Sequence, residues 1–211
     1  NNIKVIKENL IDKIIKYKKS KINKFYPLDK QITGQSHLEK INIIIEFLKK
    51  NKLDHIFVSA PENVAWLLNI RGKDSPTSPI PNSHLLISRN RKRILIAPKE
   101  KLKILIKKKI ININEILEPK EFYKINERLS GSRILLDIKS CSLKFEELFS
   151  KKFKVFKKND PTYYLKSIKN NLQSSIDGKK EKLTKISDAI WEAAETSLEE
   201  FTSSKISKNT F

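Results

Sequence analysis

The residue types that most often perform chemistry in proteins are few in this chain and do not cluster. Three histidines occur, His37, His55 and His84, and the one cysteine, Cys141, lies in "KSCSLKF" with no histidine after it. A metal site needs three or four ligands brought together, and a nucleophilic cysteine needs a base beside it. We therefore expect the histidines to be structural or exposed, the thiol to be inert, and no metal to be bound by this chain.

Carboxylates and glycines also lack the spacing of a site. Glu146–Glu147 and Glu199–Glu200 are adjacent residues, which point in different directions on a helix. The glycines are too scattered to form a phosphate-binding loop, at 34, 72, 131 and 178. The sequence thus predicts no catalytic residue within this chain.

One stretch departs from the lysine- and isoleucine-rich background, "APENVAWLLNIRGKDSPTSP" at residues 60–79. A short helix through Leu68, with core residues Val64, Leu67 and Leu68, should carry Trp66 and stop near Gly72. Prolines then hold the chain extended, so that a stiff loop presents polar side chains, and such loops often carry function. We select Trp66, Asn69, Arg71 and Asp74 as candidates for a substrate-access or interdomain loop; the alternative is that Arg71 and Asp74 only bond the loop's own backbone.

The elements around this stretch can be predicted from periodicity and caps. Residues 3–17 read as a basic amphipathic helix and residues 18–35 as an ordered linker. Ser36 and Glu39 form a capping box before a helix whose apolar face comprises Leu38, Ile41, Ile45 and Leu48. The run "HIFVSA" (55–60) predicts a central strand buried on both faces, followed by a second capping box, Ser59 with Glu62.

The remaining chain alternates strands and helices. "HLLIS" and "RILIAP" predict a hairpin on the turn "RNRK". We then expect helices at 99–109, 118–130 (stopped by Gly131) and 143–150, and strands at 110–113, 133–138 and 153–158. Asp160-Pro161 predicts the start of a helix through about Leu172, and a long amphipathic helix is expected beyond 178. This pattern predicts an α/β, three-layer fold with a mixed β-sheet and helices on both faces.

Composition favours a lysine-coated surface over a dedicated anionic partner. The formal net charge is +20, a balance often associated with nucleic acid or an anionic membrane. Arginine, the residue preferred for phosphate and base contacts, occurs only at 71, 89, 91, 93, 128 and 133. We expect no specific nucleic-acid partner and, without an apolar run long enough to span a bilayer, no membrane partner.

The single cysteine suits a reducing, cytoplasmic compartment. No signal peptide is evident, and the absence of methionine suggests a processed or partial chain.

Four ordered segments resemble the Xaa-Pro aminopeptidases, the aminopeptidase P family. "AWLLNIRGKDSPTSPIPNSHLLI" is similar to the family's middle-domain motif. "ENLIDKIIKYKK" resembles the end of its first domain, "YPLDKQITGQSHLEKI" the next junction, and "NDPTYYLKSIKNN" the link into the catalytic domain. The resemblance covers about residues 8 to 171 and departs from the family pattern after Asn171.

The resemblance implies a creatinase/prolidase N-terminal-domain-like fold and a non-catalytic role. Residues 1–35 would be the end of a preceding domain and a linker, 36–160 the α/β domain, and 161–211 a helical extension in place of the start of the catalytic domain. In the family, a pita-bread domain carries two divalent metals, manganese or zinc, and removes an N-terminal residue that precedes proline. The implied partners are a missing catalytic domain and, indirectly, its peptide substrate, with a homodimer as a further option.

Three hypotheses follow from these observations. The first is a non-catalytic module of a Xaa-Pro metalloaminopeptidase. The second is a basic nucleic-acid-binding protein, whose affinity would fall steeply with salt. The third is a stand-alone interaction protein derived from the peptidase.

Overall fold

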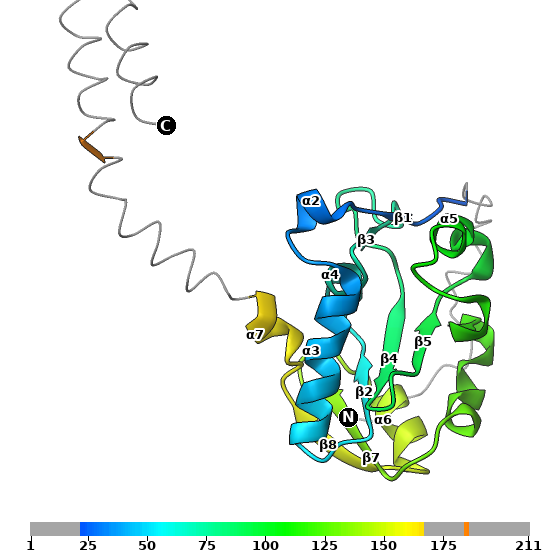
Figure 1. Ribbon diagram of the computed structural model, residues 1–211. Coiled ribbons are helices and arrows are strands. Elements are labelled where there is room, and N and C mark those ends of the chain that lie inside the picture. The colour runs from blue at the N-terminus through cyan, green and yellow to red at the C-terminus, as the bar shows by residue number, and fades with distance from the viewer. Residues whose placement is uncertain (1–21, 167–183, 186–211) are drawn as a thin grey trace, which may run out of the picture. The chain divides into compact units, whose positions relative to one another are not determined.

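A six-stranded mixed sheet crosses the centre of the fold in the order β6-β5-β4-β2-β7-β8 (Figure 1). The computed structural model describes residues 22–166 and 184–185. The strands are, in chain order, β2 (His55–Val58), β4 (His84–Ser88), β5 (Arg93–Ile96), β6 (Ile116–Leu117), β7 (Arg133–Asp137) and β8 (Lys154–Lys158). The chain divides into two compact units after Thr162, and the sheet lies in the first.

β4 runs antiparallel to the other five strands of the sheet. β4 pairs antiparallel with both β2 and β5, which forms the predicted hairpin. β2, β7 and β8 run parallel to one another, as do β5 and β6. β2 is central, and all four of its residues are buried, as its β-branched and aromatic composition predicts.

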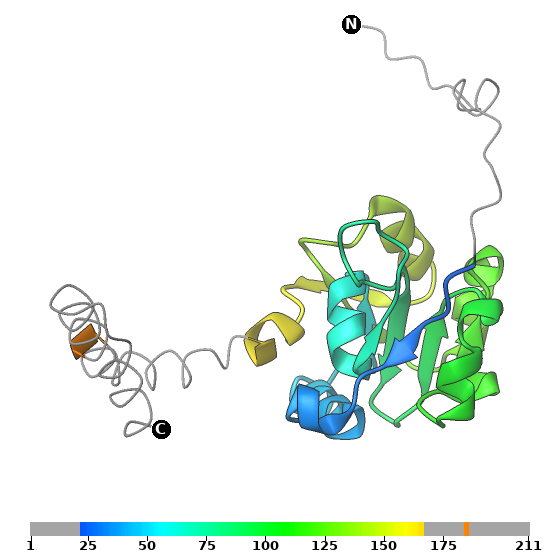
Figure 2. The ribbon, with the colours of Figure 1, turned by 90° about the horizontal axis from the view of Figure 1, so that it is seen from above.

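Helices cover both faces of the sheet (Figure 2). On one face lie α3 (His37–Lys50) and α4 (Pro61–Leu68), and on the other lie α6 (Leu143–Ser150) and the 3₁₀ segment η3 (Pro119–Arg128). The predicted three-layer α/β fold with a mixed sheet is therefore confirmed. The first unit also contains η1 (Lys99–Lys101), α5 (Lys103–Lys107) and η2 (Ile113–Glu115). The boundary between the two units falls at the start of α7 (Thr162–Lys166).

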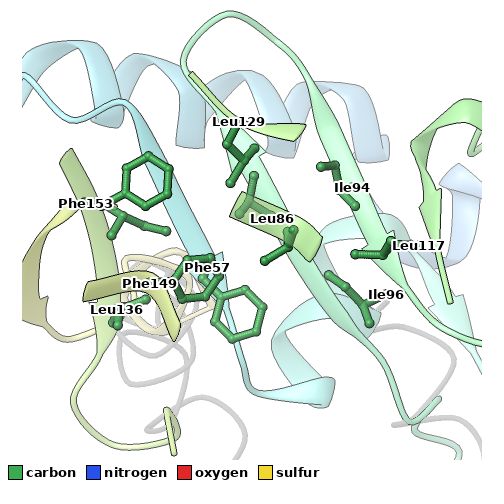
Figure 3. Packing of buried hydrophobic residues seen from close by; sticks show 11 residues of the cluster. Phe57, Leu86, Ile94, Ile96, Leu117, Leu129, Leu136, Phe149 and Phe153 are labelled. Atoms are coloured by element: carbon green, nitrogen blue, oxygen red, sulfur yellow. The ribbon is translucent and has the colours of Figure 1, made fainter. Parts of the chain in front are cut away.

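The core beneath α6 and η3 is rich in aromatic residues. Phe57 of β2 and Phe149 of α6 are fully buried, with ring centroids 5.0 Å apart. Branched aliphatic side chains from four strands complete the layer (Figure 3), among them Leu86, Ile94, Ile96, Leu117 and Leu136. Successive side chains of a strand point to opposite faces of the sheet, so every second residue of each strand contributes to this layer.

Residues 22–35, the described part of the ordered linker expected at 18–35, belong to the first unit. β1 (Tyr26–Pro27) pairs antiparallel with β3 (Ile70–Arg71), and Phe25 is fully buried. α2 (Lys30–Thr33) precedes the Ser36–Glu39 capping box, in which both reciprocal hydrogen bonds are present. That predicted cap is confirmed.

Several predicted boundaries were wrong. Ser59 does not cap α4, because Pro61 occupies the first helical position and makes Ala60 the N-cap. α4 runs through Leu68, as predicted, but the residue that ends it is Asn69, in the left-handed conformation at φ 53°, rather than Gly72. Leu38 is 57% exposed rather than core.

The segment between the hairpin and β7 differs most from prediction. The helix expected at 99–109 is divided into η1 and α5, and the strand expected at 110–113 forms instead at 116–117. Asn112 caps η2 through a capping box with Glu115, which diverts the chain from an extended path. Residues 119–128 form a 3₁₀ helix where an α-helix was expected. The helix predicted at 3–17 and the continuation to Leu172 lie outside the described residues, as does the helix predicted beyond 178 except for residues 184–185.

Candidate interdomain site

The polar loop that follows α4 begins at Asn69, whose side chain joins three segments. Its backbone N–H bonds the carbonyl of Trp66, and its carbonyl accepts from Leu28 N at 2.8 Å. Its Nδ2 donates to Thr33 Oγ1 at 3.1 Å and to the carbonyl of Gln35 at 2.8 Å. Asparagine suits this position because it tolerates a left-handed conformation better than most non-glycine residues.

Lys40 completes this junction from α3. The side chain is 2% exposed, and its Nζ donates to Asn69 Oδ1 at 2.7 Å and to the carbonyl of Trp66 at 2.9 Å. The same ammonium lies 4.0 Å from the centroid of the Trp66 ring. A buried cation is therefore held by helix-end acceptors and an aromatic face, and this arrangement fixes Trp66 and the start of the loop.

Beyond Asn69 the chain passes through β3 and then turns tightly at Gly72. Arg71 is half-buried, and its Nη1 donates to the carbonyl of Ile70 at 2.9 Å. A Cβ on Gly72 would lie 2.8 Å from Pro81 Cα and 3.2 Å from Phe25 Cδ1. Glycine is thus required here by close approach between the two ends of the loop and the N-terminal segment.

Asp74 secures the proline-rich part of the loop. Its Oδ2 accepts from Asn82 N at 2.8 Å, and its Oδ1 lies 2.6 Å from Lys101 Nζ in η1. Asp74 therefore bonds the loop's own backbone and also a neighbouring element. The structure brings Trp66 and Asn69 together at the Lys40 junction, whereas Arg71 and Asp74 make separate local contacts.

A second polar cluster lies at the carboxyl ends of the parallel strands β2, β7 and β8. Asp137 and Asp160 are each 1% exposed, and Asp137 Oδ1 accepts from Asp160 N at 3.0 Å. Asp137 Oδ2 accepts from Ser140 Oγ at 2.6 Å, and Ser140 Oγ lies 2.7 Å from Ser59 Oγ. In open α/β sheets this edge is where ligands bind; here the protein's own side chains fill it.

Asp160 anchors the chain as it leaves the first unit. Its Oδ2 accepts from Asn63 Nδ2 of α4, and its Oδ1 accepts from Thr162 N, each at 2.8 Å. Burial raises the pKa of the Asp160 carboxyl, and the nearby Asp137 charge adds to that shift. Asp160 thus bonds the N–H of the first residue of α7, but the helix begins at Thr162 rather than at the predicted Pro161. The bond to Asn63 connects the segment after β8 to α4.

The histidines and the cysteine occupy structural positions. His55 Nδ1 lies 2.8 Å from Ser88 Oγ, and His84 Nδ1 donates to the carbonyl of Ser59 at 2.8 Å. Burial lowers the pKa of His37, His55 and His84, so the neutral imidazole is favoured at each. Burial and the charges of nearby carboxylates raise the pKa of the Cys141 thiol to about 11. A thiol with that pKa is a poor nucleophile at neutral pH.

Within residues 22–166 and 184–185, no group of three or more His, Cys, Asp and Glu side chains is placed to hold a metal ion. No helix in the same part of the chain has the length and apolarity needed to cross a membrane.

Comparison with known proteins identifies the fold. The family model of the creatinase/prolidase N-terminal domain matches residues 17–173. The chain belongs to the creatinase/prolidase N-terminal domain family. The family resemblance is thereby confirmed, and the match covers the last three of the four sequence segments along the chain.

Curated relatives of this creatinase/prolidase N-terminal domain are named as Xaa-Pro aminopeptidases. It is 40% identical over 77 residues to the probable Xaa-Pro aminopeptidase P of Laccaria bicolor, covering 36% of this chain and 12% of that protein. It is 32% identical over 96 residues to Xaa-Pro aminopeptidase 1 of Dictyostelium discoideum, covering 42% of this chain and 15% of that protein. The matched part thus spans only 12% and 15% of these relatives.

A solved structure shows the same fold. The X-prolyl aminopeptidase of Caenorhabditis elegans, described as a cytosolic enzyme with a di-nuclear active site, matches with a TM-score of 0.59 at 20% identity. The match covers 74% of this chain and 27% of that enzyme.

Sequence reasoning missed Lys40 and the Asp137–Asp160 pair. The sequence did indicate the burial of Lys40, because this residue falls on the buried stripe of α3 with Ile41, Ile44 and Ile45. The two aspartates had no such signal, since they are 23 residues apart and meet only through the pairing of β7 with β8.

Proposed function

We propose that this chain acts as a non-catalytic packing module for the catalytic domain of a cytosolic Xaa-Pro aminopeptidase. The observation that carries the proposal is the family match over residues 17–173, together with curated relatives named for that activity. The described residues offer no set of metal ligands, so the chemistry would belong to the catalytic domain. The peptide substrate would then meet this chain only indirectly.

The loop from Trp66 to Asp74 is the surface that we assign to the interdomain contact. Lys40 and Asn69 fix its start, and Lys101 and Asn82 hold Asp74 near its middle. Because the loop is already held at both points, it would lose little conformational entropy when it docks through the half-buried Arg71 and Trp66. Docking at this loop would narrow the approach to the catalytic site and favour short peptides.

The activity of the chain alone provides the first test. The purified full-length chain is incubated with manganese and a peptide that has proline in the second position. We expect no release of the first residue above the protein-free rate. Turnover that persists through purification and disappears with a chelator would overturn the non-catalytic assignment.

The packing role requires a direct binding measurement. The full-length chain is mixed with the separately expressed catalytic domain of the Laccaria bicolor relative and examined by sedimentation velocity. We expect a complex that Arg71→Ala and Trp66→Ala weaken, while Lys50→Gln, on the exposed side of α3, leaves it unchanged. Absence of a complex, or equal effects of all three changes, would refute the assignment of this loop.

A further inference from the structure

A pocket lies between η3 and α6 on the face of the sheet opposite α3. Its volume is about 590 Å³, within the range of small-molecule sites. The aliphatic and aromatic part of its lining comprises Ile96, Pro119, Phe122, Tyr123, Phe145 and Leu148, and His84 also borders it. This pocket is separate from the loop assigned to interdomain packing.

The floor of the pocket is held in place by aromatic contacts. The Phe145 ring lies 4.8 Å from that of Phe122 and 5.2 Å from that of Phe57, centroid to centroid. The His84 ring lies 5.0 Å from that of Phe145 and approaches it edge-on. Phe57 belongs to the buried core (Figure 3), so the floor is continuous with the rigid interior. A pre-formed apolar floor of this kind favours a flat or branched apolar group.

The rim of the pocket is charged, in contrast to its apolar floor. Lys120, Lys144 and Lys151 line it together with one acidic residue, Glu147. Within the described part of the chain none of these three lysines forms an ion pair, whereas the nearby Lys157 is paired with Glu146 at 2.6 Å. Three cations against one anion at the mouth of an apolar pocket complement a ligand with an apolar body and a negative end.

We propose that the pocket between η3 and α6 binds a small carboxylic acid with an aromatic body. The ring packs on Phe122, Phe145 and Leu148, and the carboxylate is directed to Lys144 and Lys151 at the two ends of α6. Lys151 is the residue that directly follows α6. The assignment rests on the pocket's lining alone and holds whether or not the chain docks on a catalytic domain.

Three probes of one shape separate charge from apolar contact. The full-length chain is titrated with 3-phenylpropanoate, its neutral amide, and phenethylamine, and binding is followed by shifts of backbone amides in NMR spectra. We expect the carboxylate to shift residues 119–123 and 144–151 and to bind at least about tenfold more tightly than the amide. The amine should not bind.

Substitutions at the rim test the site itself. The pair Lys144→Gln and Lys151→Gln, both exposed, should weaken carboxylate binding by about tenfold. Tyr123→Ala, at a side chain that is 64% exposed, should weaken the carboxylate and the amide alike without threatening the fold. Lys50→Gln is the matched control, because it removes one exposed lysine on α3, across the sheet.

Each contrary outcome bears on the proposal. If no probe binds, or if the shifted amides lie elsewhere, the pocket is not a ligand site. If the amide equals the carboxylate, the lysines have no role in recognition. If Lys50→Gln weakens binding as much as the rim pair, the effect is general attraction to a chain of net charge +20.

Discussion

Asn69 and Lys40 show how two residues can define the start of a functional loop. The amide of Asn69 satisfies the buried ammonium of Lys40 and two acceptors near the end of α2, while its backbone takes the left-handed conformation that ends α4. A buried ammonium that loses an acceptor retains its desolvation cost. The position therefore demands both a backbone preference and a side-chain acceptor.

Replacing Asn69 separates these two requirements. Asn69→Ala should lower the free energy of unfolding by roughly 2–4 kcal/mol, from left-handed strain and the lost acceptor. Asn69→Gly keeps the backbone preference and should cost about 1 kcal/mol less than the alanine variant. Urea unfolding at constant m-value measures both. Equal stability of the two variants would mean that the backbone conformation contributes nothing.

Individual residues were predictable where a local pattern determined their environment. Val64, Leu67 and Leu68 are fully buried, as the helical spacing of α4 predicts. Lys40 was missed because a lysine is rarely buried, and the acceptors that make its burial possible include the end of a second helix, 26 residues away.

The loop after α4 is stiff because other elements hold it. Gly72 N donates to the carbonyl of Pro79 at 3.0 Å, and Asn23 Nδ2 donates to the carbonyl of Lys73 at 2.9 Å. The pairing of β1 with β3 brings Phe25 against Gly72. The loop thus depends on a segment that sequence alone suggested was a linker.

Gly72→Ala tests this close approach. The added Cβ would meet the backbone of Pro81, which cannot move without opening the loop, so stability should fall by about 1–3 kcal/mol. Gly34→Ala is the matched control, because Gly34 has a positive φ of 71° but open space around it, and strain alone should cost about 1 kcal/mol. Thermal or urea unfolding compares the two. A smaller loss at Gly72 than at Gly34 would contradict tight packing of the loop.

Elements with strong local signals were predicted, and those set by tertiary contacts were not. The hairpin of β4 and β5 follows from two apolar runs around a polar turn, and α3 from its capping box. The strand expected at 110–113 forms instead at 116–117, where β6 pairs with β5. Periodicity cannot distinguish which of two apolar pairs, Ile110–Ile111 or Ile116–Leu117, reaches the sheet edge.

For the whole domain, the α/β fold class could be predicted from the sequence, but the order of the strands in the sheet could not. Alternating strands and helices imply layers, whereas the order β6-β5-β4-β2-β7-β8 depends on pairings between distant segments. Those pairings also create the two buried acidic positions at opposite ends of the parallel strands. Asp54 precedes β2 and bonds the start of β7, and Asp160 follows β8 and bonds the end of β7.

The two carboxyls have opposite pKa shifts. Burial by itself would raise the pKa of Asp54, but the N–H groups of Ser132 and Arg133 donate to it and Arg89 lies 3.2 Å away, so the net pKa is lowered. Burial raises the pKa of Asp160, and its hydrogen bonds do not reverse that shift. The same fold therefore stabilises the charged form at one end of its parallel strands and destabilises it at the other.

Opposite shifts predict opposite pH dependence of stability. A lowered pKa means that the contribution of Asp54 is present above its unfolded pKa, about 3.9, and is lost as pH falls through the folded value. A raised pKa means that the contribution of Asp160 to stability is full below that unfolded pKa and is lost as pH rises through the folded value.

Relative to Asp54→Asn, the native chain should therefore gain stability as pH rises from about 3 to 5. Relative to Asp160→Asn it should lose stability from about pH 4 upward. Urea unfolding of the three proteins at constant ionic strength gives both difference curves, and curves of the same slope would show that the two ends of the strands do not differ electrostatically.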